Sequence, residues 1–222
     1  AAELDGVSLG DWMNNQLKNE KARQLFTVAA EAIFATDAAT ISLLHALFYI
    51  RSGRDFDTLM NIKKGAQQDR IAGGAQSIAN RMAEELSGHI RLNMPVTRIA
   101  QSENQVTVSG DDFSFDAKKI ILAVPPVVAA KIIFEQPLPA GKKQFLEQNF
   151  MGTVIKCYAV YPSPFWRNEG KNGLCAAPGQ AVSVTFDNSP ADGSKGILMG
   201  FALAEKAKAL LQMTEQDRKK LV

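Results

Sequence analysis

The sequence is poor in the residue types that most often mark a functional site. Its 222 residues include two cysteines and two histidines, which define neither a disulfide framework nor the ligand spacing of a metal site, so we expect no bound metal. The same scarcity of cysteine favours a reducing compartment, and we therefore predict a cytoplasmic location. The familiar motifs for dinucleotide, phosphate and zinc binding are absent as well, among them G-x-G-x-x-G and H-E-x-x-H.

A strong charge imbalance and long apolar runs are also missing. The 25 basic and 23 acidic residues give a formal net charge of +2, and no long segment gathers the basic ones, which argues against nucleic acid as a partner. No apolar run approaches the roughly twenty residues that a membrane-spanning helix needs, so we expect no membrane segment in this chain. With 46% hydrophobic residues, there is material for a sizeable core and for one or two domains.

The patterns that are present change character along the chain. Residues 1–70 show helical spacing, with Ser8 and Asp11 as a capping box and a second helix through ISLLHALFYI. From His89 onward alternating runs predict strands, including QVTVSG and DFSFD joined by a tight turn, and the apolar run IILAV predicts a strand buried on both faces. Helix and sheet then return. Because strands and helices do not alternate regularly, this order predicts α+β layers or two interleaved domains.

One lysine stands in an otherwise apolar strand. The stretch FMGTVIKCYAVY, residues 150–161, reads as a strand in which Lys156 shares a face with Val154, Tyr158 and Val160. A lysine in such a place must extend its ammonium group to solvent, pair with a carboxylate, lose its proton or contact a bound ligand. The residues alone favour an edge strand or an extended lysine stem, and they leave a functional role open.

Six stretches, taken in order, resemble the flavin-containing amine oxidases, the family of monoamine and polyamine oxidases. They cover nearly the whole chain and are most similar to the monoamine oxidase branch: GAQQDRIAGGAQSIANRM, LNMPVTRI, IILAVPP with AAKIIFEQPLP, FMGTVIKCY, PFWRN and DNSPADGSKGILMGFALAEKA. The resemblance implies an α+β fold in which residues 1–68 and 137–222 form a substrate domain of helices packed on a mixed sheet. Residues 69–136 would be a returning segment of an FAD-binding α/β domain.

The resemblance also implies that the chain is the middle of a longer enzyme. The family's glycine-rich pyrophosphate turn and its last FAD segment have no counterpart in this sequence. The final stretch TEQDRKKLV agrees with this, because Thr214 and Asp217 open a helix that stops about two turns later. We therefore expect the chain alone to have an incomplete cofactor site and to be inactive.

Four residues receive roles from the resemblance. Lys156 matches the lysine that reaches the flavin N5 through a bound water, where a cation suits developing negative charge. Val96 in MPVTRI matches a position whose main chain contacts the adenine end of FAD. Gln67 matches a glutamine that lines the amine pocket, although GAQQD departs from the family's usual Gly-Gly-Gln-Glu order. Met60 is expected in the same cavity, with simple packing as the alternative.

The activity that the resemblance implies is FAD-dependent oxidation of an amine to an imine, which then gives an aldehyde, with oxygen reduced to hydrogen peroxide. The expected partners are a small amine and oxygen, and nothing in the sequence indicates an oligomeric state. Two alternatives remain open at this point: a flavin oxidase or desaturase of a non-amine substrate, and a non-catalytic binding module that keeps the substrate-domain fold.

Overall fold

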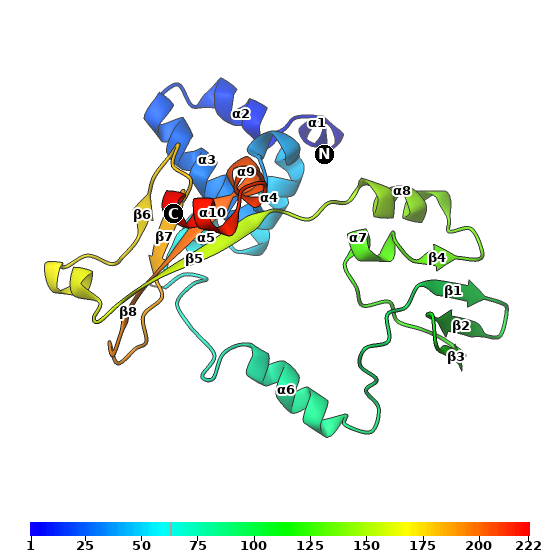
Figure 1. The fold of residues 1–222 in the computed structure, drawn as a ribbon. Coiled ribbons are helices and arrows are strands. Elements are labelled where there is room, and N and C mark those ends of the chain that lie inside the picture. The colour runs from blue at the N-terminus through cyan, green and yellow to red at the C-terminus, as the bar shows by residue number, and fades with distance from the viewer. Residues whose placement is uncertain (63) are drawn as a thin grey trace. The chain divides into compact units, whose positions relative to one another are not determined.

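A computed structural model describes residues 1–62 and 64–222, and the chain divides into two compact units (Figure 1). Unit 1 is discontinuous and consists of Ala1–Asp69 and Gly152–Val222, whereas unit 2 is the continuous segment Arg70–Met151. Each unit has its own sheet of four strands. The fold is therefore α+β, as the sequence predicts.

The boundaries of the units differ in part from the expected domain limits. One lies next to the predicted change at residues 68 and 69, but the other falls between residues 151 and 152 rather than near residue 137. The reason is helix α8 (Ala140–Gln148), which packs against helix α7 (Pro126–Ala129) within unit 2. The assignment of a substrate role and an FAD role to these segments stays a prediction.

Five α-helices of unit 1 begin at side chains that cap them. Ser8, Asn19, Ser42, Asp55 and Thr214 each accept a hydrogen bond from the main-chain N–H three residues later, which satisfies a donor that the first helical turn leaves unpaired. The N-caps predicted at Ser8 and Thr214 are thus confirmed, and in each the hydroxyl donates to the side-chain carboxylate of the predicted acidic partner, Asp11 or Asp217, at 2.8 Å. The helices are α1 (Ala2–Asp5), α2 (Leu9–Gln16), α3 (Glu20–Phe34), η1 (Ala38–Thr40), α4 (Leu43–Ser52), α5 (Phe56–Met60), η2 (Phe165–Glu169), α9 (Ala204–Leu211) and α10 (Glu215–Leu221). Over residues 1–62 and 64–222, no helix combines the length and the apolar character that crossing a bilayer requires.

The sheet of unit 1 has the strand order β5-β8-β7-β6 and is antiparallel at every pairing. Its strands are β5 (Val154–Tyr161), β6 (Cys175–Ala176), β7 (Val184–Asp187) and β8 (Gly196–Leu203). The resemblance led us to expect a mixed sheet here. Two of its three pairings, β6–β7 and β7–β8, join strands that follow one another through short connections that reverse the chain direction, as neighbouring antiparallel strands allow, whereas β5 pairs with β8 across the longer connection that contains β6 and β7.

Helices cover both faces of this sheet at the central strand β8. On one face, Val28 of α3 packs against Val184 and Leu203. On the other face, Ala207 of α9 packs against Ala202. Burying a side chain the size of valine or leucine contributes about 1.5–3 kcal/mol. The helices therefore fix β8 from both sides, whereas β5 is left as an edge strand.

A carboxylate on β7 anchors the loop that follows β5. Asp187 accepts hydrogen bonds from Trp166 Nε1 at 3.1 Å, from Arg167 Nε at 2.6 Å and from the Ser189 main-chain N–H at 2.8 Å. Burial alone would raise the pKa of Asp187, but the bonds from Arg167, Ser189 and Trp166 outweigh it and hold this pKa well below its ordinary value. The stretches PFWRN and DNS, far apart in the sequence, are joined at this carboxylate.

Unit 2 contains the mixed sheet, in the order β3-β2-β1-β4, with β1 and β4 parallel and the other pairs antiparallel. The predicted hairpin of QVTVSG and DFSFD is confirmed as β2 and β3, which are closed by a hydrogen bond of 3.1 Å from the Gly110 N–H to the Phe113 carbonyl. Besides α7 and α8, the elements are α6 (Gln76–Glu85), β1 (Arg98–Gln101), β2 (Val106–Ser109), β3 (Ser114–Ala117) and β4 (Ile133–Phe134).

The strand predicted at IILAV is wrong. Residues 118–124 form no strand, and Ile121 is 95% exposed. An apolar run becomes a buried strand only where neighbouring strands pair with its main chain and other layers cover its faces. Within the described residues, no strand pairs with this run.

Glu31 of α3 is a charged side chain buried in unit 1. Its side chain is 11% exposed, and its Oε2 lies 3.9 Å from Lys206 Nζ of α9. Lys206 donates its hydrogen bond of 2.9 Å to Ser183 instead, and Oε2 has no hydrogen-bond partner among the described residues. Burial raises the pKa of Glu31, Lys206 lowers it and Asp37 raises it again, with a net increase.

Replacing Glu31 with glutamine is expected to raise the free energy of unfolding at pH 7 by about 1 kcal/mol, because the amide keeps the side-chain shape and removes a poorly compensated buried charge. In the wild type, the folded state binds a proton at Glu31 more tightly than the unfolded state does. Stability should therefore fall as the pH rises above the ordinary carboxyl pKa of 4.5. Denaturant unfolding of the full-length protein between pH 4.5 and 8 measures the difference between the two proteins.

The matched control is Glu205→Gln, because Glu205 is an exposed carboxylate that also pairs with a lysine, at 2.7 Å. The free energy of unfolding of Glu205→Gln should differ little from that of the wild type at every pH. A Glu31→Gln variant whose stability difference from the wild type does not grow with pH would show that the buried carboxylate is well compensated.

Candidate functional site

Strand β5 presents Lys156 on a partly uncovered face of the sheet. Lys156 alternates with Val154, Tyr158 and Val160 on one side of the strand. Val154, Tyr158 and Val160 are 41%, 56% and 62% exposed. The exposed fraction of these side chains thus increases along β5 from Val154, which lies opposite the buried Leu203, towards Val160. We call this surface the open face. It consists of Val154, Lys156, Tyr158 and Val160 on β5 and of Phe201, Met199 and Ile197 on β8.

The ammonium group of Lys156 rests on an aromatic ring. Its Nζ lies 5.1 Å from the ring centroid of Phe201, the residue directly opposite in the β5–β8 register. Among the residues that the structure describes, no ion pair joins Lys156 to a carboxylate. Of the explanations that the sequence left open, β5 is indeed an edge strand and Lys156 is exposed, so its charge remains available to a ligand.

The other side of β5 is partly buried at its N-terminal half and exposed at Ala159 and Tyr161. Ile155 packs against the cluster that contains Ala202 and Ala207, and Cys157 shares its side of the strand. Burial raises the pKa of the Cys157 thiol above its ordinary value of 9.0. The thiol therefore stays protonated at neutral pH, and the thiolate is the form that would act as a nucleophile.

Two predicted pocket residues lie in unit 1 with Lys156, and within residues 1–62 and 64–222 no hydrogen bond joins either of them to it. Met60 is the last residue of α5 and is half-buried. Gln67 follows in a loop, where its main-chain N–H donates to the Asn61 carbonyl at 3.4 Å and its side chain is exposed. The structure therefore neither supports nor contradicts a place for Met60 and Gln67 in an amine pocket, and that role stays a prediction.

Val96 belongs to unit 2 and lies two residues before β1. Its neighbour Thr97 has both main-chain groups paired, because the N–H donates to Ser109 at 3.0 Å and the carbonyl accepts from Ile133 at 2.9 Å. Within the described part of the chain, no hydrogen bond engages the main-chain N–H or carbonyl of Val96. A contact through the main chain of Val96 is therefore compatible with this geometry.

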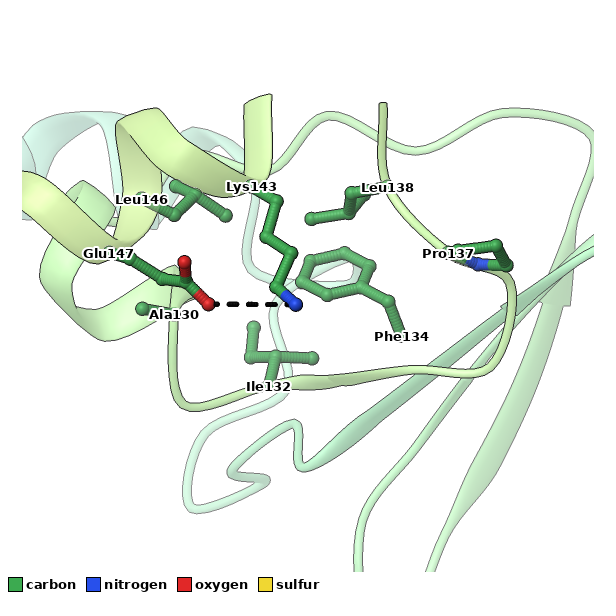
Figure 2. A pocket seen from close by; sticks show the side chains of 8 residues that line it. All are labelled: Ala130, Ile132, Phe134, Pro137, Leu138, Lys143, Leu146 and Glu147. Atoms are coloured by element: carbon green, nitrogen blue, oxygen red, sulfur yellow. Dashed lines mark ion pairs between the residues drawn. The ribbon is translucent and has the colours of Figure 1, made fainter. Parts of the chain in front are cut away.

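A separate cavity of about 280 Å³ lies within unit 2 (Figure 2). Figure 2 shows Lys143 and Glu147, one helical turn apart on α8 with 3.8 Å between Nζ and Oε1, beside an otherwise apolar lining. None of the four predicted site residues lines this cavity, so we do not include it in the candidate site. Its lining residues are Ala130, Ile132, Phe134, Pro137, Leu138, Lys143, Leu146 and Glu147.

Comparison with known proteins identifies the family. The family model of the flavin-containing amine oxidoreductases matches residues 2–222. A Mycobacterium tuberculosis protein that carries the name flavin-containing monoamine oxidase AofH is 38% identical over 201 residues, which are 90% of this chain and 44% of that protein. Cyclohexylamine oxidase from Brevibacterium oxydans has a similar structure, with a TM-score of 0.93 and 29% identity, and putrescine oxidase with bound putrescine gives a TM-score of 0.91 and 32% identity.

This chain therefore belongs to the family of flavin-containing amine oxidoreductases. The resemblance seen in the sequence is confirmed, and the family implies FAD as the cofactor. Both structural comparisons cover 100% of this chain and 49% of the other chain, so the chain spans about half the length of these relatives.

Sequence reasoning did not find Phe201. Its place on a strand face follows from the alternation in ILMGFALA, but its position opposite Lys156 depends on the β5–β8 register. Register is set by the buried pattern of both strands and by their connection. The connection from Tyr161 to Gly196 includes two further strands, so the sequence offers no local signal for this pair.

Proposed function

We propose that the full-length protein is an FAD-dependent oxidase that converts an amine to an imine and reduces oxygen to hydrogen peroxide. The observation that carries this proposal is the cation of Lys156, presented without a carboxylate partner among the described residues on the open face, in a chain of a flavin-containing family. When bound, FAD accepts a hydride equivalent from the amine and passes its electrons to oxygen.

The residues present fit such a cofactor in two places. The open face is apolar and carries one positive charge, which suits an aromatic ring system on which negative charge develops. The main chain of Val96 offers one donor and one acceptor, which suits the hydrogen-bonding edge of adenine. We therefore assign Lys156 to both cofactor contact and catalysis, and Val96 to cofactor contact.

Lys156 supplies three N–H donors on a flexible stem. These donors can hold a water molecule in a fixed position while the ammonium charge favours nearby negative charge. Tyr158 and Val160 extend the apolar surface beside it, against which an aromatic ring can pack. No general base is assigned, because an unprotonated amine needs none.

We assign Gln67 and Met60 to binding of the substrate amine. The amide oxygen of Gln67 can accept a hydrogen bond from an amine N–H, and the thioether of Met60 can adapt its shape to an apolar substituent. The names of the structural relatives, putrescine oxidase and cyclohexylamine oxidase, support an amine as the substrate rather than a non-amine compound.

The visible spectrum of the full-length protein tests this proposal. Anaerobic addition of cyclohexylamine or putrescine is expected to bleach the flavin bands, and admission of oxygen should restore them with formation of hydrogen peroxide. Cyclohexanol is the matched control, because it has the same ring and lacks the amine. Bleaching by cyclohexanol alone would indicate a non-amine substrate, and a protein without flavin bands would favour the non-catalytic binding module.

A further inference from the structure

We propose that Phe201 is a positioning residue for Lys156, because its ring fixes where the ammonium group lies on the open face. The proposal rests on the proposed function, since it concerns the role assigned there to Lys156. The contact itself is a property of this chain, with 5.1 Å between Nζ and the ring centroid. A cation within about 6 Å of a ring centroid is attracted by the negative face of the ring.

The ring is the fixed partner of this pair. Phe201 packs against the buried cluster of Val28, Val184 and Leu203, and its ring contacts that of Phe186, with 5.3 Å between centroids and 52° between planes. A lysine side chain, in contrast, has a long flexible stem with many rotamers. The buried cluster therefore holds the ring, and the ring limits the positions that the ammonium group can take.

An aromatic ring positions the cation in a different way from a carboxylate. A carboxylate would balance the charge of Lys156 and engage its N–H donors. A ring attracts the ammonium group from one side and carries no net charge. Among the described residues, no carboxylate thus balances the ammonium group of Lys156, and the donors that point away from the ring remain available to a water or a ligand.

The alternative is that Phe201 serves only as packing and that Lys156 lies over it without consequence. The two explanations differ in what they require at position 201. Packing requires an apolar side chain of similar volume, which leucine provides at small cost in a partly exposed site. Positioning requires an aromatic face, which tyrosine retains and leucine lacks.

Three variants of the full-length protein separate these explanations: Phe201→Leu, Phe201→Tyr and Phe186→Leu. Phe186 is the matched control, because it packs on the same cluster and on the same sheet face as Phe201 but no contact joins it to Lys156 in the described chain. The first readout is the proton resonance of the Lys156 ε-methylene group in protein labelled with ¹³C-lysine, assigned by its loss in Lys156→Arg. The second is the rate at which oxygen reoxidises the flavin after chemical reduction with dithionite, which requires no substrate.

The ring current of the aromatic side chain at position 201 should shift the Lys156 resonance upfield. This shift is expected in the wild type and in Phe186→Leu, which have phenylalanine there, and in Phe201→Tyr, which has tyrosine. The shift should vanish in Phe201→Leu, whose reoxidation should be about two- to fivefold slower, the factor that corresponds to a cation–π contact at an exposed site. Phe201→Tyr and Phe186→Leu should reoxidise at rates close to that of the wild type.

An unshifted Lys156 resonance in the wild type would overturn the proposal, and this result does not depend on whether Phe201→Leu folds. Bleaching by amines together with equal reoxidation rates in Phe201→Leu and Phe186→Leu would also overturn it while leaving the proposed function intact. A shifted resonance in a protein that no amine bleaches would support the contact and remove the proposed function. The two failures are therefore distinguishable.

Discussion

Replacement of Lys156 with methionine in the full-length protein is expected to slow reoxidation of the flavin by oxygen by about a hundredfold, the effect of removing one well-placed donor or charge where negative charge develops. Methionine keeps an unbranched apolar stem and loses the charge and the three N–H donors. The absorption spectrum of the oxidised protein should be retained. Stopped-flow mixing of the reduced protein with oxygen measures the rate.

A second lysine supplies the control for this experiment. Lys208 is an exposed residue of α9 that pairs with Glu205 at 2.7 Å, and Lys208→Met should leave reoxidation unchanged. Lys156→Arg, which keeps the charge and changes the donor geometry, should lie between the wild type and Lys156→Met. Equal rates in the wild type and in Lys156→Met would reduce Lys156 to an exposed lysine on an edge strand.

Replacement of Asp187 with asparagine is expected to lower the free energy of unfolding by about 2–3 kcal/mol. The asparagine amide nitrogen is a donor and would face the Trp166 and Arg167 donors that now meet a carboxylate. We expect a smaller loss of stability than for a fully buried ion pair, because solvent screens the interaction. The Arg167 side chain is 39% exposed and that of Asp187 is 11% exposed.

The stability that Asp187 contributes changes with pH in the opposite direction to the stability that Glu31 contributes. Because its folded pKa is lowered, the stability that Asp187 contributes is fully present above the ordinary carboxyl pKa of 3.8 and is lost as the pH falls through the lowered folded value. The difference between Asp187→Asn and the wild type should therefore be constant between pH 6 and 8 and should shrink in acid.

Denaturant unfolding followed by tryptophan fluorescence measures this effect, since Trp166 is buried in the same loop. Asp192→Asn is the control, because the Asp192 carboxylate accepts a hydrogen bond of 3.0 Å from the Ser194 N–H in an exposed turn. The free energy of unfolding of Asp192→Asn should be close to that of the wild type. If Asp187→Asn were as stable as Asp192→Asn, the loop would be held by its aromatic contacts instead of by the carboxylate.

Local structure could be predicted from the sequence because its signals lie close together. The N-caps at Ser8 and Thr214 each involve a partner three residues away, and the β2–β3 hairpin is closed by residues close in the chain. The failure at Ile121 has the opposite cause. Hydrophobicity shows that a run can be buried, but only its pairing partners decide whether it becomes a strand.

The site could be predicted only in part, because some of its contacts join residues that are distant in the sequence. The apolar surroundings of Lys156 were visible in the sequence, and its role came from the resemblance. Its contact with Phe201 depends on a register between distant strands. Glu31 did carry a signal, because it follows Val28 by three residues and so lies on the same side of α3. A glutamate beside a buried stripe is usually solvated, so this spacing alone did not indicate a buried charge.

The discontinuity of unit 1 sets an order for its folding during synthesis. Val28 of α3 packs against Val184 and Leu203, which leave the ribosome more than 150 residues after it. At about 5–20 residues per second, the apolar side of α3 waits on the order of ten seconds for its sheet. Unit 2 is continuous, and its sheet can close during that interval. The apolar side of α3 therefore stays exposed during synthesis for longer than the strands of unit 2 do, and it is a segment that a chaperone can protect.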